Sequence, residues 1–371
     1  MWELPSSVAA ATPVWIVVLI VVAAGVGAVG FYAGYEYRRS PAASPTEVEN
    51  STLSLLAAGT LTSFFPPLAA DLVLQTHGIT APSAAQTYEG SLDVTTAITS
   101  LSARTDVAAV ADFRLIPSSL EPRYANYEVV FASTPEVLVY NASIRAFDGI
   151  NATNWGAKLL SAVGTPGVPP FGVWNASTDP NGYNEIFAMM LQGLVYGGGN
   201  ASVYSQFYEG TPGGLATPNP ALTRIERESQ AALLVRSGVV SALITYRAYA
   251  VANHLANVTF DPTVGLSASN ATALSEYARV STEIVSSTGT LVTVRPAPIL
   301  FAATVPENAP NPGLGAAFVH LLVSPQGSAV LSAGEAFTPI FPAWTDNAAA
   351  VPPVLAPDVV PLPAWTSGLL A

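Results

Sequence analysis

Cysteine is absent from the 371-residue chain. Its absence excludes disulfide bonds, thiolate metal sites and cysteine nucleophiles. Histidine is scarce as well, because the chain has only His77, His254 and His320, far apart in the sequence. A zinc centre or a histidine-based general base therefore has few residues to draw on.

Charged residues are also few, at 10% of the chain, and they are mostly acidic, so that the formal net charge is −12. The sequence has no basic cluster longer than Arg38-Arg39. Because the phosphate backbone of a nucleic acid requires a positive stripe, we expect no nucleic-acid partner. Hydrophobic residues make up 50% of the chain, which excludes a largely disordered protein and allows a large core.

The chain does contain one long apolar run near its start. Val14–Gly34 carries no charge over 21 residues, which is enough for a helix to cross a bilayer, and Trp15 resembles an interfacial aromatic residue. The residues before it include Glu3 but no Lys or Arg, unlike the basic start of a signal peptide. We predict that residues 1–40 form an N-terminal transmembrane helix that anchors the protein, with a cleaved signal segment as the alternative. A Pro/Ser-rich linker follows over 41–52.

Seven Asn-X-Ser/Thr sequons point to an exported protein, since such sites are glycosylated on the surface of secreted chains. The positive-inside rule would place the side that carries Arg38-Arg39 in the cytoplasm, but two arginines are a weak signal beside seven sequons. We therefore predict a cell-membrane protein with its bulk on the extracellular side. The potential glycosylation sites are Asn50, Asn141, Asn151, Asn175, Asn200, Asn257 and Asn270.

After the linker, apolar runs of strand length alternate with segments of helical spacing, as in α/β units with a largely parallel sheet. Three predicted helices open at the turns Gly59-Thr60, Gly90-Ser91 and Asp179–Gly182. In an open α/β sheet such turns gather at the carboxyl ends of strands, where ligands bind. Their N–H groups and hydroxyls suit an oxyanion, although helix capping is the commoner reason for such turns. A carboxylate such as Asp179 is unexpected at an anion site.

The last segment, 345–371, is rich in Pro, Ala and Val, is almost uncharged and repeats the sequence PAWT that ends at Thr345. We predict an extended, irregular tail. Because so apolar a segment is rarely left in solvent, it should dock on the domain or, by self-association, on a neighbouring molecule.

The order of segments resembles that of the archaeal-type tungstate/molybdate-binding proteins, which are periplasmic-binding-protein-like receptors of oxyanion ABC importers. The resemblance runs from about Leu53 to about Pro342. It rests on several motifs in the family's order: AAGTL and YEGS at the two hydroxyl turns, TDVAAVADFRLIP, NWGAKLL, STDPNGYNE against the family's D-P-C-G-Y-R, and IERESQAALLVRSGVVSALITYR.

The resemblance implies an α/β fold of the two-lobed type II periplasmic-binding-protein-like class over 53–344. One lobe would take about 53–137 and 251–344, and the other about 138–250, with hinge closure on the ligand. It further implies no enzymatic activity and no cofactor. An ABC permease and its ATPase would be the partners.

The ligand residues also follow from the resemblance. Thr60 and Ser91 would donate hydrogen bonds to the oxygens of the anion. Asp179 and Glu228 would reach the metal itself and expand tetrahedral tungstate or molybdate toward six oxygen ligands. The remaining binding residues would be Pro180, Asn181 and Tyr246.

Two carboxylates repel the oxygens of any dianion in a poorly solvated site. Sulfate and phosphate would feel only this repulsion, whereas a large hexavalent metal can accept carboxylate oxygen directly. Asp179 and Glu228 would therefore select against the commoner anions.

Some alternatives stay open. Glu228 could be a first-turn acid that complements its helix dipole, and Tyr246 could be ordinary strand packing. Asn181 and Asn184 replace the Cys and Arg of the family motif, so the alternative function is a cell-surface structural or assembly protein that keeps the fold without the ligand.

Overall fold

The computed structural model describes residues 51–370 apart from 77, 200–201 and 287–288, and these residues belong to one compact unit. The predicted anchor over 1–40, almost all of the linker, and the sequons at Asn50 and Asn200 lie outside the described residues. Within the described part, no single helix has the length and hydropathy to cross a bilayer. One bent pair of helices, α10 (Pro312–Val323) and α11 (Pro325–Leu331), is long and apolar enough when taken together, with 67° between the two helices; this rests on length and composition alone.

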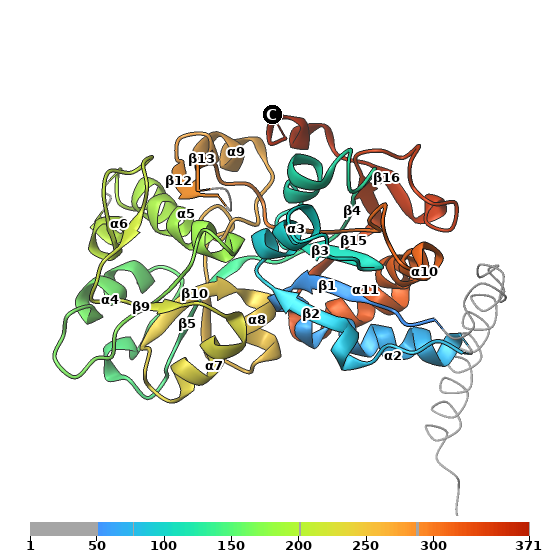
Figure 1. The fold of residues 1–371 in the computed structure, drawn as a ribbon. Helices are drawn as coiled ribbons and strands as arrows, with labels where there is room; N and C mark the ends of the chain where they lie inside the picture. Colours follow the sequence, from blue (N-terminus) through green and yellow to red (C-terminus); the bar gives the residue numbers. More distant parts are fainter. Residues whose placement is uncertain (1–50, 77, 200–201, 287–288, 371) are drawn as a thin grey trace, which may run out of the picture. The chain divides into compact units, whose positions relative to one another are not determined.

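The larger lobe is built on a seven-stranded sheet with the order β16-β15-β4-β14-β3-β1-β2 (Figure 1). Its strands are β1 (Leu55–Ala58), β2 (Gln86–Glu89), β3 (Val107–Val110), β4 (Val129–Ser133), β14 (Leu300–Thr304), β15 (Thr338–Thr345) and β16 (Val359–Pro361). Strands β2, β1 and β3 are parallel neighbours, and β14 joins β3 in the antiparallel sense. The main helices of this lobe are α2 (Phe65–Gln75), α3 (Ser91–Thr99), α10 (Pro312–Val323) and α11 (Pro325–Leu331).

Strands β1 and β3 are apolar and buried at every position, as expected for parallel strands that are covered on both faces. Alternate residues of β1 enter two separate cores: Leu55 packs in the core that includes α2 and α10, and Leu56 in the core that includes α3. This alternation fixes the register of β1.

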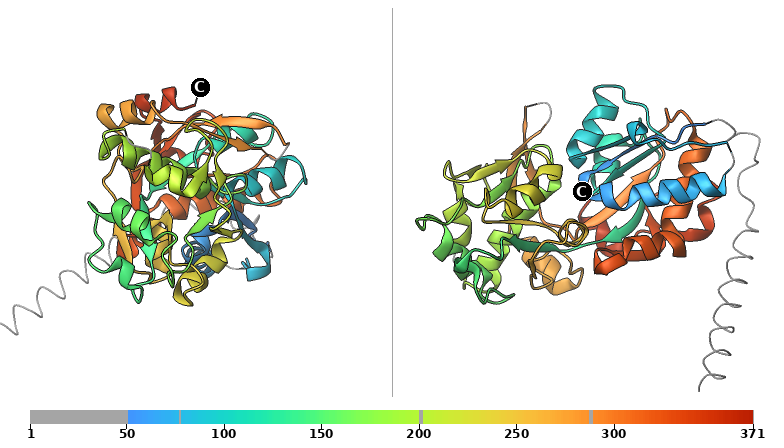
Figure 2. Two further views of the ribbon diagram at one scale, coloured as in Figure 1. Left: turned by 90° about the vertical axis from the view of Figure 1, so that its left-hand side faces the viewer. Right: turned by 90° about the horizontal axis from the view of Figure 1, so that it is seen from below.

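The smaller lobe combines a three-stranded sheet, β10-β5-β11, with the parallel pair β6-β9 (Figure 2). Its strands are β5 (Glu136–Tyr140), β6 (Gly172–Trp174), β9 (Thr223–Ile225), β10 (Ala242–Tyr246) and β11 (Asn257–Thr259). The other elements of the middle of the chain are α4 (Trp155–Ala162), α5 (Pro180–Val195), α6 (Ser202–Phe207), β7 (Tyr208–Glu209), β8 (Thr217–Pro218), α7 (Glu228–Arg236), α8 (Arg247–Ala252), α9 (Ala271–Tyr277), β12 (Thr282–Val285) and β13 (Leu291–Val294). Trp174 Nε1 donates to the Ile244 carbonyl at 2.6 Å, which ties β6 to β10.

The chain crosses between the lobes twice. The first crossing is the Thr134-Pro135 step from β4 to β5, close to the predicted boundary. The second comes later than the sequence predicts, because β11 still pairs with β5 and the chain re-enters the larger sheet only at β14. The run Asn257–Thr259 is three residues long and has too little pattern to be recognised as a strand from the sequence.

The C-terminal segment docks on the larger lobe, which is one of the two possibilities that its composition left open. β16 pairs with β15 in the parallel sense and becomes the edge of the sheet. Trp365 packs edge-on against Trp344 with 6.1 Å between ring centroids, and Asp358 pairs with His320 at 2.8 Å. Part of the segment is therefore regular structure rather than an irregular extension.

A group of carboxyls fixes the start of this segment. Asp346, the residue after β15, accepts a hydrogen bond from the backbone N–H of Glu128 at 2.8 Å. Burial and the charge of Asp346 raise the pKa of Glu121 to about 8. Burial, together with Asp346 and Glu121, raises the pKa of Glu128 well above its usual range. These carboxyls therefore hold protons that the unfolded chain releases.

We expect the protein to lose stability as the pH rises. Because the pKa of Glu121 is about 8 in the folded chain against an ordinary 4.5, its contribution is full below about pH 4.5 and is lost by about pH 8. Glu121→Gln removes this titration, so thermal denaturation should show a smaller fall in Tm across that range than in the wild-type protein. Glu209→Gln, at an exposed position of the smaller lobe, is the control. An unchanged pH dependence in Glu121→Gln would contradict the assignment.

Candidate functional site

Three parallel strands of the larger lobe end side by side and deliver polar residues to one edge of the sheet. Thr60 lies in the short helix Gly59–Ser63 directly after β1, and Ser91 opens α3 two residues after β2. Asp112 follows β3 by two residues. All three side chains are buried. The prediction that both Gly-hydroxyl turns open helices is confirmed.

The smaller lobe delivers its carboxylates in the same way. Asp179 follows β6 and Glu228 follows β9, and these two strands are parallel neighbours. Asp179 caps α5, because its Oδ1 accepts a hydrogen bond from the Asn181 backbone N–H at 2.9 Å and Pro180 takes the first helical position. The predicted cap is confirmed. Asp179 and Glu228 both keep part of their surface exposed.

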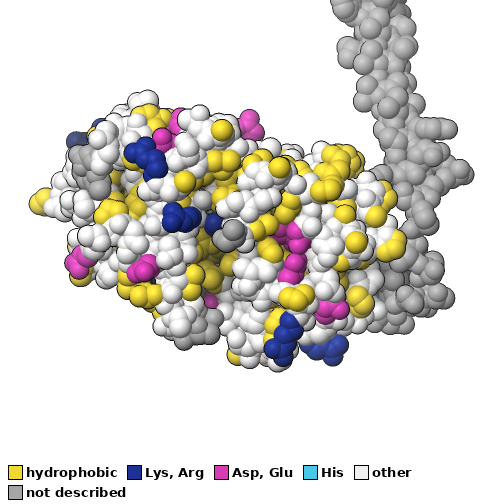
Figure 3. Space-filling view, turned by 90° about the horizontal axis from the view of Figure 1, so that it is seen from above, with side chains coloured by type: hydrophobic (Ala, Val, Ile, Leu, Met, Phe, Trp, Pro, Cys, Tyr) yellow, Lys and Arg dark blue, Asp and Glu magenta, His cyan; other side chains and the backbone are white. Residues whose placement is uncertain are grey.

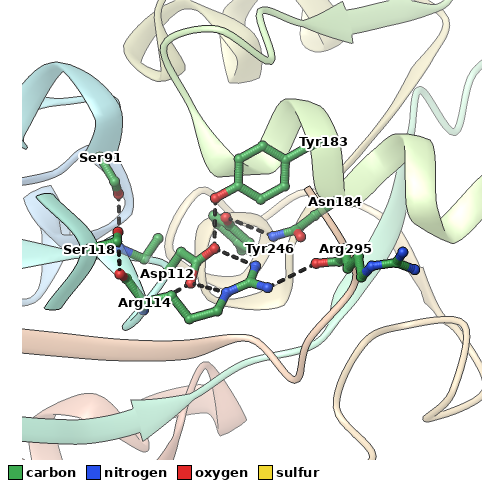
Figure 4. Close-up of polar contacts among 9 residues, drawn as sticks. Ser91, Asp112, Arg114, Ser118, Tyr183, Asn184, Tyr246 and Arg295 are labelled. Atoms are coloured by element: carbon green, nitrogen blue, oxygen red, sulfur yellow. Dashed lines mark hydrogen bonds and ion pairs between the residues drawn. The ribbon is translucent and has the colours of Figure 1, made fainter. Parts of the chain in front are cut away.

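The two lobes meet at these strand ends. Thr60 Oγ1 donates a hydrogen bond to Glu228 Oε1 at 2.8 Å, and the Leu92 N–H donates to the Thr178 carbonyl at 3.2 Å. Ser91 Oγ accepts a hydrogen bond from the Ala111 N–H at 2.8 Å (Figure 4). Since a hydroxyl can also donate, the proton of Ser91 stays available to a further acceptor.

Two glycines permit this close approach. A Cβ on Gly90 would lie 2.2 Å from the Thr178 carbonyl oxygen, and a Cβ on Gly59 would lie 2.4 Å from Glu228 Oε2. A side chain at position 90 would push away the backbone of the opposite lobe, whereas one at position 59 would first displace the Glu228 side chain. Gly90 is therefore required by the backbone contact between the lobes, and Gly59 leaves room for Glu228.

Carboxyl groups dominate the electrostatics of the site. Burial and the negative charge of Asp179 raise the pKa of Glu228 well above its usual range, although the hydrogen bond from Thr60 lowers it. Burial raises the pKa of Asp179 to about 6. The hydrogen bond from the Asn181 N–H opposes this rise, and the charge of Asp93 adds to it. A positive centre placed between Asp179 and Glu228 would relieve this cost.

Tyr246 and the two asparagines of the motif lie behind the carboxylates. Asn184 Nδ2 donates to the Tyr246 hydroxyl at 3.3 Å, and Asn181 Nδ2 donates to Thr245 Oγ1 at 2.9 Å. Asn181 Oδ1 is buried and has no partner among the described residues. The amide that replaces the family's Arg thus orients Tyr246.

A further carboxyl, that of Glu136, lies on the strand that pairs with β10 and was not predicted from the sequence. It stands opposite Tyr246 in the pairing of β5 with β10, is fully buried, and neither of its oxygens has a partner within the described part of the chain. Burial, followed by the charges of Glu185, Asp179 and Glu228, raises its pKa well above the usual range. The site therefore favours the protonated form of Glu136 more strongly than water does.

Sequence reasoning also missed the cluster of Asp112, Arg114 and Tyr183 (Figure 4). Arg114 Nε and Nη2 donate to the two oxygens of Asp112 at 2.9 and 2.6 Å. Tyr183, on α5 of the smaller lobe, donates its hydroxyl proton to Asp112 Oδ2 at 2.7 Å. The only signal in the sequence is an acid and a base two residues apart at the end of an apolar strand.

No group of three or more His, Cys, Asp or Glu side chains is placed to hold a metal ion, as far as the described residues go. Asp179 and Glu228 alone make an incomplete coordination sphere.

The described sequons differ in accessibility. Asn151 and Asn270 are exposed, whereas Asn141, Asn175 and Asn257 are half-buried.

On the face shown in Figure 3, acidic and basic side chains form only small separate groups among apolar and neutral ones.

The chain is similar in sequence to extracellular solute-binding proteins. Residues 53–334 match the family model of the bacterial extracellular solute-binding proteins. An uncharacterized solute-binding protein of Methanoculleus marisnigri is 28% identical over 311 residues, with 80% of this chain and 83% of the relative covered. The molybdate/tungstate-binding protein WtpA of Thermococcus kodakarensis is 26% identical over 253 residues, with 65% and 68% covered.

Two solved structures have a similar fold. The periplasmic molybdate-binding protein of Azotobacter vinelandii gives a TM-score of 0.52 at 14% identity, over 77% of this chain and 98% of that one. The sulfate-binding protein SubI of Mycobacterium tuberculosis gives 0.51 at 14% identity, over 83% and 90%. The predicted α/β, periplasmic-binding-protein-like fold is thereby confirmed.

We expect Gly90→Ala to separate the two lobes, because the added methyl group would overlap the Thr178 carbonyl. Small-angle X-ray scattering should show a larger radius of gyration than in the wild-type protein. Gly313→Ala, where nothing lies within 4 Å of the added carbon, should scatter like the wild type. Identical scattering from Gly90→Ala and the wild type would show that the contact is not made in solution.

Proposed function

Because this chain belongs to the bacterial extracellular solute-binding protein family, whose members serve ABC transporters and are not enzymes, we propose that it is a receptor for tetrahedral oxyanions of the tungstate/molybdate class. It would deliver the anion to a membrane permease that is driven by an ATPase. The residues before the described part would anchor it to the cell membrane, with its bulk on the extracellular side.

One observation carries the proposal. Thr60, from the larger lobe, and Glu228, from the smaller lobe, lie within hydrogen-bond distance of each other. A hydroxyl that can donate to an anion and a carboxylate that can ligate a metal therefore share one site, and each comes from a different lobe. Such an arrangement supports a type II receptor whose lobes close on the ligand.

Each residue would have a distinct part in binding. Thr60 and Ser91 would donate to the oxygens of the anion, helped by the N–H groups at the helix starts. Asp179 and Glu228 would each bind the metal, whose positive charge would remove the repulsion between the two carboxylates. Tyr246, held by Asn184, would close the back of the site.

The charge balance favours an anion with a large central metal over sulfate or phosphate. Two partly buried carboxylates near one another raise the cost of any dianion that offers only oxygen atoms. Tungsten and molybdenum can instead accept the carboxylate oxygens as extra ligands. The same two side chains thus repel the common anions and hold the rare ones. Pro180 and Asn181 keep Asp179 in place by starting the helix that it caps.

We expect Asp179→Ala and Glu228→Ala each to weaken tungstate binding by about 100-fold, since each loses a charged ligand. Sulfate binding should be unchanged or tighter, because a repulsive group is removed. Isothermal titration calorimetry with tungstate, molybdate, sulfate and phosphate measures both effects.

Glu209→Ala, which removes an exposed carboxylate of the smaller lobe, is the matched control for the net charge. If either site variant kept the wild-type preference for tungstate over sulfate, the role of its carboxylate would be refuted. A wild-type protein that binds none of the four anions would favour the surface structural role instead.

A further inference from the structure

A second contact between the lobes lies beside the proposed anion site and uses none of the residues assigned to the ligand. Tyr183 is on α5 of the smaller lobe, and Asp112 is at the end of β3 in the larger lobe. The Tyr183 hydroxyl donates to Asp112 Oδ2 at 2.7 Å, and both residues are buried. Figure 4 shows the two side chains facing one another.

Asp112 is a rigid and ionised acceptor. Arg114 holds both of its oxygens, and the Arg114 backbone N–H donates to Oδ1 at 3.1 Å. Arg114 Nη1 also donates to the Arg295 carbonyl at 2.9 Å, which fixes the guanidinium from the other side. Although burial opposes it, Arg114 lowers the pKa of Asp112 below its ordinary value. A buried acid and base that satisfy each other in this way add no net charge near the anion.

The position of Tyr183 on its helix gives the contact its effect. Asp179 is the N-cap of α5 and Tyr183 lies in the first turn of the helix, so both residues are at the same end of α5. A hydrogen bond from a hydroxyl to a buried carboxylate is among the stronger kinds. The contact with Asp112 therefore holds the end of α5 that carries Asp179 against the larger lobe.

We propose that Tyr183 is a positioning residue: its hydrogen bond to the Asp112–Arg114 pair holds the two lobes together and slows release of the anion, without selecting among anions. The part about release rests on the proposed function. The part about the lobes does not.

Tyr183→Phe removes the hydroxyl alone. The dissociation rate of tungstate, measured by stopped-flow fluorescence on the full-length chain, should rise about tenfold, with the association rate unchanged. The Kd values for tungstate, molybdate and sulfate should rise by one common factor, in contrast to Asp179→Ala. Tyr204→Phe is the matched control, since Tyr204 is a buried tyrosine of the same lobe whose hydroxyl has no partner among the described residues.

A second measurement needs no ligand. Because the chain lacks cysteine, spin labels can be placed through Leu101→Cys and Leu233→Cys, one in each lobe, at side chains that are 75% and 68% exposed. Pulsed electron paramagnetic resonance should give a longer and broader distance distribution for Tyr183→Phe than for the wild type or Tyr204→Phe. If Tyr183→Phe does not fold, Asp112→Asn, which keeps an acceptor oxygen but weakens it, should show a smaller shift in the same direction.

Two outcomes would overturn the inference: a distance distribution identical to the wild type, or a changed order of preference among the anions. If the wild-type protein binds none of these anions, the proposed function fails, and the distance measurement still decides whether Tyr183 holds the lobes together.

Discussion

The structure depends on the contact between two rows of strand ends, one in each lobe. Parallel strands release their chains at a common edge, so β1, β2 and β3 place Thr60, Ser91 and Asp112 along one line. Strands β6 and β9 do the same for Asp179 and Glu228. Gly59 and Gly90 then allow the rows to approach to hydrogen-bond distance. Without this approach the carboxylates would stay hydrated, with little electrostatic cost for a ligand to relieve.

Because the chain carries few charges, few groups near the site can offset the repulsion between Asp179 and Glu228. Arg114 is paired with Asp112, so its positive charge is already used and does not offset this repulsion. Asn184 gives the site an amide where the resemblance leads one to expect a cation, and that amide is already used by Tyr246. The ligand itself would therefore have to supply the positive centre, which is a stricter requirement than charge complementarity alone.

The part of the fold that could be predicted from sequence is the part encoded locally. The Asp-Pro-Asn-Gly turn specifies a capped helix by its own chemistry, and Asp179 caps α5 as predicted. The helix starts at Thr60 and Ser91 follow from Gly-hydroxyl turns in the same way. The placement of Glu228 came from the resemblance, since an acid in the first turn of a helix is common for reasons of the dipole.

What the sequence could not indicate are contacts between distant segments with no shared pattern. Asp112 and Tyr183 are 71 residues apart, and nothing at either position identifies the other. Glu136 reads as the first residue of an ordinary strand until its pairing with Tyr246 is known. The tail has the same limitation, because β16 is a strand only where β15 offers it an edge.

Selection and retention of the anion would rest on different contacts in this arrangement. A ligand can shift an equilibrium between open and closed lobes only through contacts that differ between the two states. An anion held by Thr60 and Glu228 together has such contacts, because these residues belong to opposite lobes. Asp179 caps α5 and Tyr183 lies in its first turn, so the proposed metal ligand and the contact with Asp112 are held at the same end of one helix. The contact between Tyr183 and Asp112 would hold the lobes together for any bound anion, whereas Asp179 would favour only an anion whose central metal can accept its oxygen.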